Sequence, residues 1–161
     1  MAFLQIDYKS EALMRGVNIK VILPSDGMAG KWEPPYKTLY LLPGYSATAT
    51  ELITYLGLRG QSELKGIAIV LPDGENLFYQ DLPDRMTFYS TYVGKELVEV
   101  TRKMLPLSTK REDTFIGGIS MGGYGALYNG FKYRDTFSKV VAFSPASDAY
   151  MLLAEEDAPG F

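Results

Sequence analysis

The residues TFIGGISMGGYGAL, at positions 114–127, contain the most informative pattern in the sequence. It opens with a mainly apolar run that predicts a strand buried on both faces. It continues into small and apolar residues that predict a helix from Met121 to about Phe131. Between the two, Gly118-Ile119-Ser120-Met121-Gly122 matches the pattern G-x-S-x-G, which is typical of a sharp strand-turn-helix bend. We therefore predict that the Ser120 hydroxyl lies at the carboxyl end of a sheet, where it can act as a nucleophile.

The glycines of the pattern, Gly118 and Gly122, suit such a bend because a Cβ at either position would crowd the turn. The bend directs the backbone N–H of Met121 and the positive end of the following helix towards the space in front of Ser120. An oxyanion formed during acyl transfer would lie in that space. We therefore predict Met121 as one donor of an oxyanion hole. A tight helix entry without chemistry is the alternative interpretation.

A second oxyanion donor is expected from the loop after an earlier strand, Leu42-Pro43-Gly44-Tyr45-Ser46. Among its backbone N–H groups we choose that of Tyr45, with Ser46 as the alternative. An ordinary Pro-Gly turn is the competing interpretation of this loop.

Strands and helices alternate along the rest of the chain. Residues near the N-terminus alternate in polarity and predict two strands joined near Arg15-Gly16, whereas continuous apolar runs predict buried strands. A helix capped by Thr50 should end near Gly57 or Gly60. The predicted strands are residues 3–8, 17–23, 38–42, 67–71, 114–119 and 140–143, and a helix over 90–105 should bury Val93, Leu97, Val100 and Met104. This order predicts an α/β fold with an antiparallel start and a mostly parallel sheet between flanking helices.

The amino-acid composition limits the kinds of site that the chain can form. The chain has 161 residues, 47% of them hydrophobic, a net charge of −3, and neither cysteine nor histidine. Disulfides and Cys/His zinc sites are therefore excluded, and the usual proton carrier near neutral pH is missing. The mild acidity disfavours nucleic acid or an anionic membrane as a partner. Asp7 and Glu11 lie where a signal peptide would be apolar, and no run reaches the ~18 apolar residues of a membrane span, so the cytoplasm is expected.

Other patterns lack the residues that their chemistry needs. Gly123 and Tyr124 occupy positions where a P-loop has Lys and Ser/Thr, and no G-x-G-x-x-G follows a strand. The acidic residues 81, 84 and 155–157 lack the spacing of a calcium loop. We expect neither a cofactor nor a metal.

Three segments of the chain resemble the esterase D group of the α/β-hydrolase superfamily, which includes tributyrin esterases and S-formylglutathione hydrolases. They are LYLLPGYS (39–46), VLPDG (70–74) and GISMGGYGAL (118–127), and the resemblance runs from about residue 17 to 145. It implies hydrolysis of short acyl or aromatic acyl esters through an acyl-enzyme on Ser120. It also implies an oxyanion hole made by the N–H groups of Tyr45 and Met121.

The chain departs from this family at two places. Pro43 stands where the family commonly has histidine, although the N–H groups of the next residues remain. More important, the triad acid and histidine of this superfamily follow strands that come after the one ending at Phe143. Asp148 is the only acid soon after that strand, and we prefer a helix N-cap role for it over that of triad acid. Asp73 is expected to cap a loop.

The last predicted strand, residues 140–143, is apolar and would form an exposed sheet edge that invites further pairing. We therefore treat residues 1–161 as a single, incomplete domain. A missing C-terminal segment or a second chain would complete the sheet and the triad, or the edge would join copies of the chain.

The chain alone is expected to be nearly inactive. The alternatives are a non-catalytic binding or assembly module and an acyltransferase on the same scaffold. The aromatic residues Phe78, Tyr79 and Phe88 are expected either to line an acyl pocket or to pack in the core.

Overall fold

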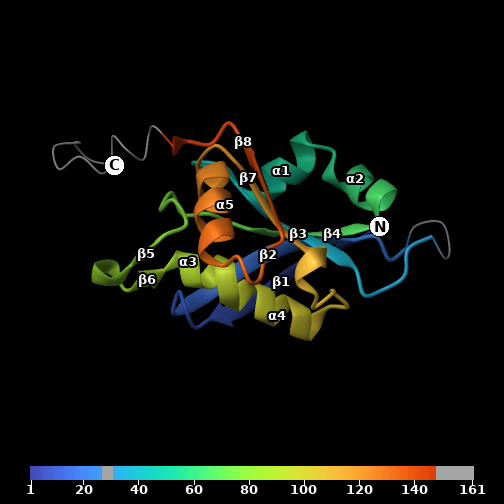
Figure 1. The fold of residues 1–161 in the computed structure, drawn as a ribbon, viewed down its shortest axis with the longest axis horizontal. Coiled ribbons are helices and arrows are strands. Elements are labelled where there is room, and N and C mark those ends of the chain that lie inside the picture. Colours follow the sequence, from blue (N-terminus) through green and yellow to red (C-terminus); the bar gives the residue numbers. More distant parts are fainter. Residues whose placement is uncertain (27–30, 148–161) are drawn as a thin grey trace.

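The computed structural model describes residues 1–26 and 31–147 of the chain. Its strands are β1 (Ala2–Ser10), β2 (Arg15–Leu23), β3 (Lys37–Leu42), β4 (Ile67–Pro72), β5 (Asp81–Leu82), β6 (Thr87–Phe88), β7 (Thr114–Ile119) and β8 (Lys139–Phe143). Six of them form one sheet in the order β1-β2-β4-β3-β7-β8, while β5 and β6 form a small separate hairpin (Figure 1). Strand β2 pairs antiparallel with β1 and β4, and the pairs β3–β4, β3–β7 and β7–β8 are parallel. This arrangement confirms the predicted fold class.

Helices cover both faces of the sheet. They are α1 (Ala49–Tyr55), α2 (Leu58–Lys65), α3 (Tyr89–Thr91), a π-helical turn (Tyr92–Glu96), α4 (Leu97–Met104) and α5 (Met121–Lys132), with 3₁₀ turns at Pro83–Arg85 and Arg111–Asp113. Helices α1 and α2 pack on one face, and α3, α4 and α5 pack on the other (Figure 1). Within the described residues no helix has the length and apolar character needed to cross a bilayer.

The connections around β3 determine where a site can form. The chain leaves β3 for β4 through α1 and α2 on one face of the sheet, and it leaves β4 for β7 through α3 and α4 on the other. The carboxyl ends of β3 and β7 therefore lie side by side at the point where the strand order reverses. Open α/β sheets bind ligands at such a point.

Sequence reasoning misplaced the cap of the first helix. The N-cap of α1 is Thr48, not Thr50: the Thr48 hydroxyl accepts from the Glu51 N–H at 3.3 Å, and the Glu51 carboxylate accepts from the Thr48 N–H at 2.7 Å. This capping box needs a hydroxyl three residues before the glutamate, and Thr48 alone satisfies that spacing. The hairpin turn also lies slightly earlier than predicted, because β2 already begins at Arg15.

The predicted buried face of the helix over residues 90–105 was partly wrong. Val93 and Leu97 are buried, but Met104 is 46% exposed, and the buried positions after Leu97 are Val98 and Thr101. The π-helical turn Tyr92–Glu96 explains the difference, because it holds more residues per turn than an α-helix and rotates the following side chains around the axis.

The tyrosine-rich core predicts steep loss of stability at alkaline pH. Burial raises the pKa of Tyr40 to about 12, and its hydroxyl lies 2.9 Å from that of Thr101. The folded state therefore keeps Tyr40 neutral, whereas the unfolded chain ionises above its ordinary pKa of about 10. Stability is fully present below pH ~10 and falls towards pH ~12, by about 1.4 kcal/mol per pH unit for each such group. Urea unfolding of wild type and Tyr40→Phe from pH 8 to 11 checks this, and equal slopes would contradict it.

Candidate active site

Ser120 lies between β7 and α5 in a backbone conformation that side chains rarely adopt, with φ 56° and ψ −118°. Its N–H donates to the Phe143 carbonyl at 2.9 Å, and its carbonyl accepts from the N–H groups of Tyr124 and Ala146, both at 3.0 Å. These bonds tie the bend to helix α5 and to the end of β8. A residue with a Cβ persists at positive φ only where its surroundings hold it, which is typical of functional bends.

Both glycines of the pattern are required by close backbone contacts. A Cβ on Gly118 would collide with the backbone of Gly122, and a Cβ on Gly122 would collide with the carbonyls of Leu42 and Pro43. The first turn of α5 thus rests directly on the end of β3. Met121, the first residue of α5, is 1% exposed, and its N–H belongs to the positive end of the helix.

The loop after β3 lies against Ser120. A Cβ built on Gly44 would lie 3.4 Å from the Ser120 Cβ. The loop closes in a turn in which the Ala47 N–H donates to the Gly44 carbonyl at 3.1 Å. The N–H of Ser46 donates to Asn76 Oδ1 at 2.7 Å, so this group is already engaged. The choice of Tyr45 as the second oxyanion donor stays a prediction.

Of the two acids considered for the triad, Asp73 lies within the described residues and has a structural contact. Asp73 Oδ1 accepts from the Ala49 N–H at 2.6 Å and so holds the start of α1, as expected for a capping residue. Asp148 lies outside the described residues. Lys132, at the far end of α5 from Ser120, bonds to Asp81 and Ser90. Among the described residues no three Asp, Glu, His or Cys side chains lie close enough to hold a metal ion.

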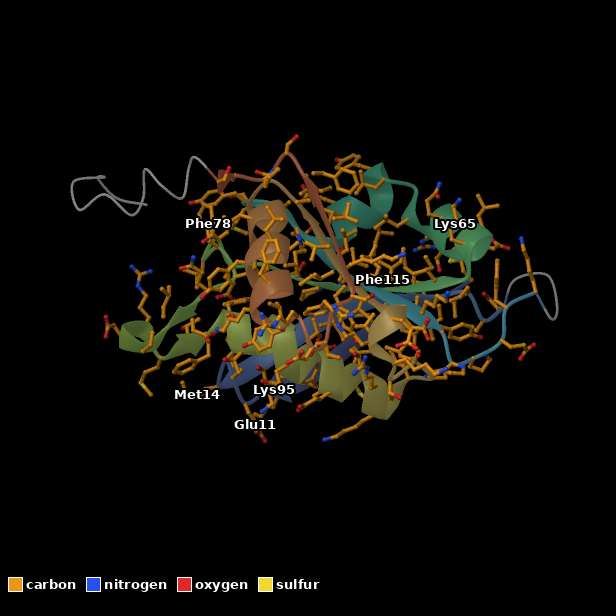
Figure 2. All side chains as sticks on the ribbon, in the orientation of Figure 1. Glu11, Met14, Lys65, Phe78, Lys95 and Phe115 are labelled. Carbon is orange, nitrogen blue, oxygen red and sulfur yellow. The ribbon has the colours of Figure 1, made fainter. Side chains whose placement is uncertain are left out.

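Two of the three aromatic residues considered for an acyl pocket are core residues. Phe78 is 8% and Tyr79 1% exposed, whereas Phe88 is partly buried. Figure 2 labels Phe78 beside α5, where its ring lies 5.7 Å from that of Tyr124. The contacts of Asn76 and Tyr79 with the loop after β3 were missed by sequence reasoning, because no residue spacing signals them.

Within residues 1–26 and 31–147 the last strand of the sheet is β8, whose side chains Val141 and Phe143 are 43% and 57% exposed. Beside them a groove of about 480 Å³ lies between the sheet and α2. It is lined mainly by apolar side chains from β3, β4, β7, β8 and the α1–α2 region, among them Leu39, Leu41, Leu56, Ile69, Ile119 and Phe143.

The strand order, the strained serine and the helix behind it together define an α/β-hydrolase fold. Residues 10–158 match the family model described as "Putative esterase". The chain therefore belongs to this esterase family of the α/β-hydrolase superfamily.

The similar proteins are longer than this chain. An acetyl esterase of Caldicellulosiruptor saccharolyticus is 40% identical over 151 residues, which cover 91% of this chain and 57% of the relative. An S-formylglutathione hydrolase of Paracoccus denitrificans is 29% identical over 86% of this chain and 55% of its own length. A substrate-bound structure of a fluorophosphonate-binding serine hydrolase of Staphylococcus aureus has a TM-score of 0.85 and 30% identity, over 96% of this chain and 61% of that one. The chain thus spans little more than half the length of the curated relatives.

Proposed function

We propose that the protein hydrolyses carboxylic esters with short acyl groups through an acyl-enzyme on Ser120. The strained Ser120 at φ 56°, between β7 and the N-terminus of α5, is the observation that carries this proposal. Such a bend presents the hydroxyl to a substrate, and the strain has no packing benefit that a glycine would not also give. The similar proteins named acetyl esterase and S-formylglutathione hydrolase support short acyl groups as substrates.

In the proposed reaction Ser120 Oγ attacks the ester carbonyl and its proton passes to a base. The carbonyl oxygen becomes an oxyanion that the N–H groups of Met121 and Tyr45 stabilise, and the alcohol then leaves with a proton. Water then attacks the carbonyl of the acyl-enzyme, the acid is released, and Ser120 Oγ regains its proton. Gly44 lies against the bend at this point, where a Cβ would approach the Ile119 carbonyl oxygen to 3.2 Å and the Ser120 Cβ to 3.4 Å.

The base is proposed to come from polypeptide outside these 161 residues, because the sequence has no histidine. This polypeptide would pair with the free edge of β8 and cover the apolar groove beside it. Stable domains usually cover their apolar faces and protect apolar sheet edges from unwanted pairing. We propose the cytoplasm as the compartment, consistent with the lack of cysteine.

Mapping the acetylated residue tests the proposal. After treatment with p-nitrophenyl acetate at pH 9, we expect mass spectrometry of peptides to find acetyl on Ser120. The ester should accumulate there because no histidine in the chain activates water for its release. The proposal would be contradicted if acetyl were found only on lysines, and if the folded and the urea-unfolded chain were acetylated at the same lysines.

A further inference from the structure

The loop that follows β4 contains unusually strained residues. Asn76, Phe78 and Tyr79 all have positive φ, at 55°, 53° and 56°. Asparagine tolerates this region, but for large side chains such as Phe and Tyr it is a genuine outlier. Such strain persists only where surrounding contacts impose it, and it gathers at functional sites.

The strained loop contacts the loop after β3 at successive positions. The Tyr79 hydroxyl donates to the Pro43 carbonyl at 2.8 Å. Asn76 Oδ1 accepts from the Ser46 N–H at 2.7 Å, and the Phe78 ring lies 6.5 Å from the Tyr45 ring. The predicted oxyanion donor, Tyr45, therefore lies between two backbone groups that the strained loop holds.

The Tyr79 hydroxyl is well suited to this contact. The residue is 1% exposed, and burial raises the pKa of its hydroxyl well above the usual value. It therefore stays protonated, and remains a hydrogen-bond donor, above the pH at which an exposed tyrosine ionises. Without this hydroxyl the buried Pro43 carbonyl would lose its hydrogen-bond donor. Loss of the contact therefore costs free energy, because a buried carbonyl without a donor is unfavourable.

The strained loop is in turn held by helix α5, which begins directly after Ser120. Asn129 Nδ2 donates to the Tyr79 carbonyl at 3.1 Å, and Asn129 Oδ1 accepts from the Ser90 hydroxyl at 2.7 Å. The Tyr79 ring also packs so closely on α5 that a Cβ on Gly125 would collide with it. One loop thus connects the helix of the nucleophile to the loop of the oxyanion donor.

We propose that residues 76–79 form a brace that fixes the loop at 43–46 relative to Ser120, with Tyr79 as the positioning residue. The inference rests on the proposed function, because it assigns the brace to that oxyanion hole. A donor stabilises an oxyanion only if it is held within hydrogen-bond distance of the place where the charge develops. The brace acts on this distance through Pro43 and Ser46, which flank Tyr45, and it touches neither the substrate nor the reacting atoms.

Phosphonylation kinetics test the brace in the chain as it is. A fluorophosphonate forms a bond from phosphorus to Ser120 Oγ, fluoride leaves, and the serine proton passes to hydroxide at pH 9. We expect Tyr79→Phe to lower the maximal labelling rate about tenfold, because loss of a complete oxyanion donor costs more, and to leave the reagent concentration for half-maximal rate unchanged. A general loss of structure would alter both.

Tyr89→Phe is the matched control. Its ring lies 6.1 Å from that of Tyr79, and its hydroxyl contacts Arg15 at 3.0 Å but no atom of the loop at 43–46. It therefore removes a tyrosine hydroxyl from the same aromatic cluster and should label at the wild-type rate. Equal rates for Tyr79→Phe and Tyr89→Phe would overturn the brace.

A second variant covers the case in which Tyr79→Phe does not fold. Asn76→Gly keeps the positive φ available and removes both side-chain bonds to Ser46, in which Asn76 Oδ1 accepts from the Ser46 N–H at 2.7 Å and Asn76 Nδ2 donates to Ser46 Oγ at 3.4 Å. We expect its maximal labelling rate to fall about threefold, a smaller loss because Tyr79 still holds Pro43. An unchanged rate in this variant overturns the brace alone. Absence of label on Ser120 in the wild type overturns the proposed function, and the brace with it.

Discussion

Ser120→Ala is expected to remove reaction with a fluorophosphonate or an activated ester almost completely, with a rate at least about 100-fold below that of the wild type. The reason is chemical, because alanine keeps the Cβ and the backbone conformation but has no oxygen to form the acyl or phosphonyl bond. The rate of wild-type labelling will itself be slow, since hydroxide replaces the missing base. Intact-mass measurement over time, at several pH values from 7 to 10, gives both rates.

Two further variants make this test specific. Ser138→Ala removes a serine before β8, whose hydroxyl lies 3.2 Å from the Thr114 carbonyl, and should react as the wild type does. Ser120→Gly should be as unreactive as Ser120→Ala. Its free energy of unfolding should exceed that of the wild type by about 1 kcal/mol, because glycine relieves the strain at φ 56°. Equal stability of Ser120→Gly and the wild type would contradict the assignment of strain to this bend.

The sequence predicted those parts of the fold that depend on local pattern. Apolar runs located β3, β4, β7 and β8 to within one or two residues, since a strand buried on both faces needs such a run. The pattern around Ser120 located the bend because it is a run of consecutive residues, and a Cβ on Gly118 would collide with the backbone of nearby Gly122. The collision of a Cβ on Gly122 with the carbonyls of Leu42 and Pro43 joins distant segments, and the pattern alone does not reveal it. The alternation of helices and strands predicted a mostly parallel sheet, but it did not predict the strand order, in which β3 lies between β4 and β7.

The features that sequence reasoning missed depend on contacts between distant segments. The π-helical turn at Tyr92–Glu96 has no residue signal of its own, and it moved the buried face from Met104 to Thr101. Likewise Tyr79 looked equally suited to a pocket and to the core. Its role becomes visible only when its hydroxyl is seen 2.8 Å from the Pro43 carbonyl, 36 positions away in the sequence.

Gly122→Ala is expected to be among the most damaging single changes in the chain, costing about 3 kcal/mol or more of the free energy of unfolding. The added methyl group would collide with the backbone carbonyls of Leu42 and Pro43. Leu42 at the end of β3 pairs with Gly118 of β7, so this end cannot move away without breaking the pairing of β3 with β7. The first turn of α5 would have to move instead, and Met121 and Ser120 would move with it.

Gly60→Ala is the matched control, because a Cβ at this exposed position in α2 meets nothing within 4 Å. It should stabilise the chain by about 0.5–1 kcal/mol, as alanine for glycine does within a helix. Urea unfolding of both variants measures the two free energies, and labelling of folded Gly122→Ala measures the displacement of Ser120. If Gly122→Ala were as stable and as reactive as the wild type, α5 would not rest on the end of β3. The support that this contact gives to the proposed oxyanion hole, in which Met121 follows Ser120 at the start of α5, would then be lost as well.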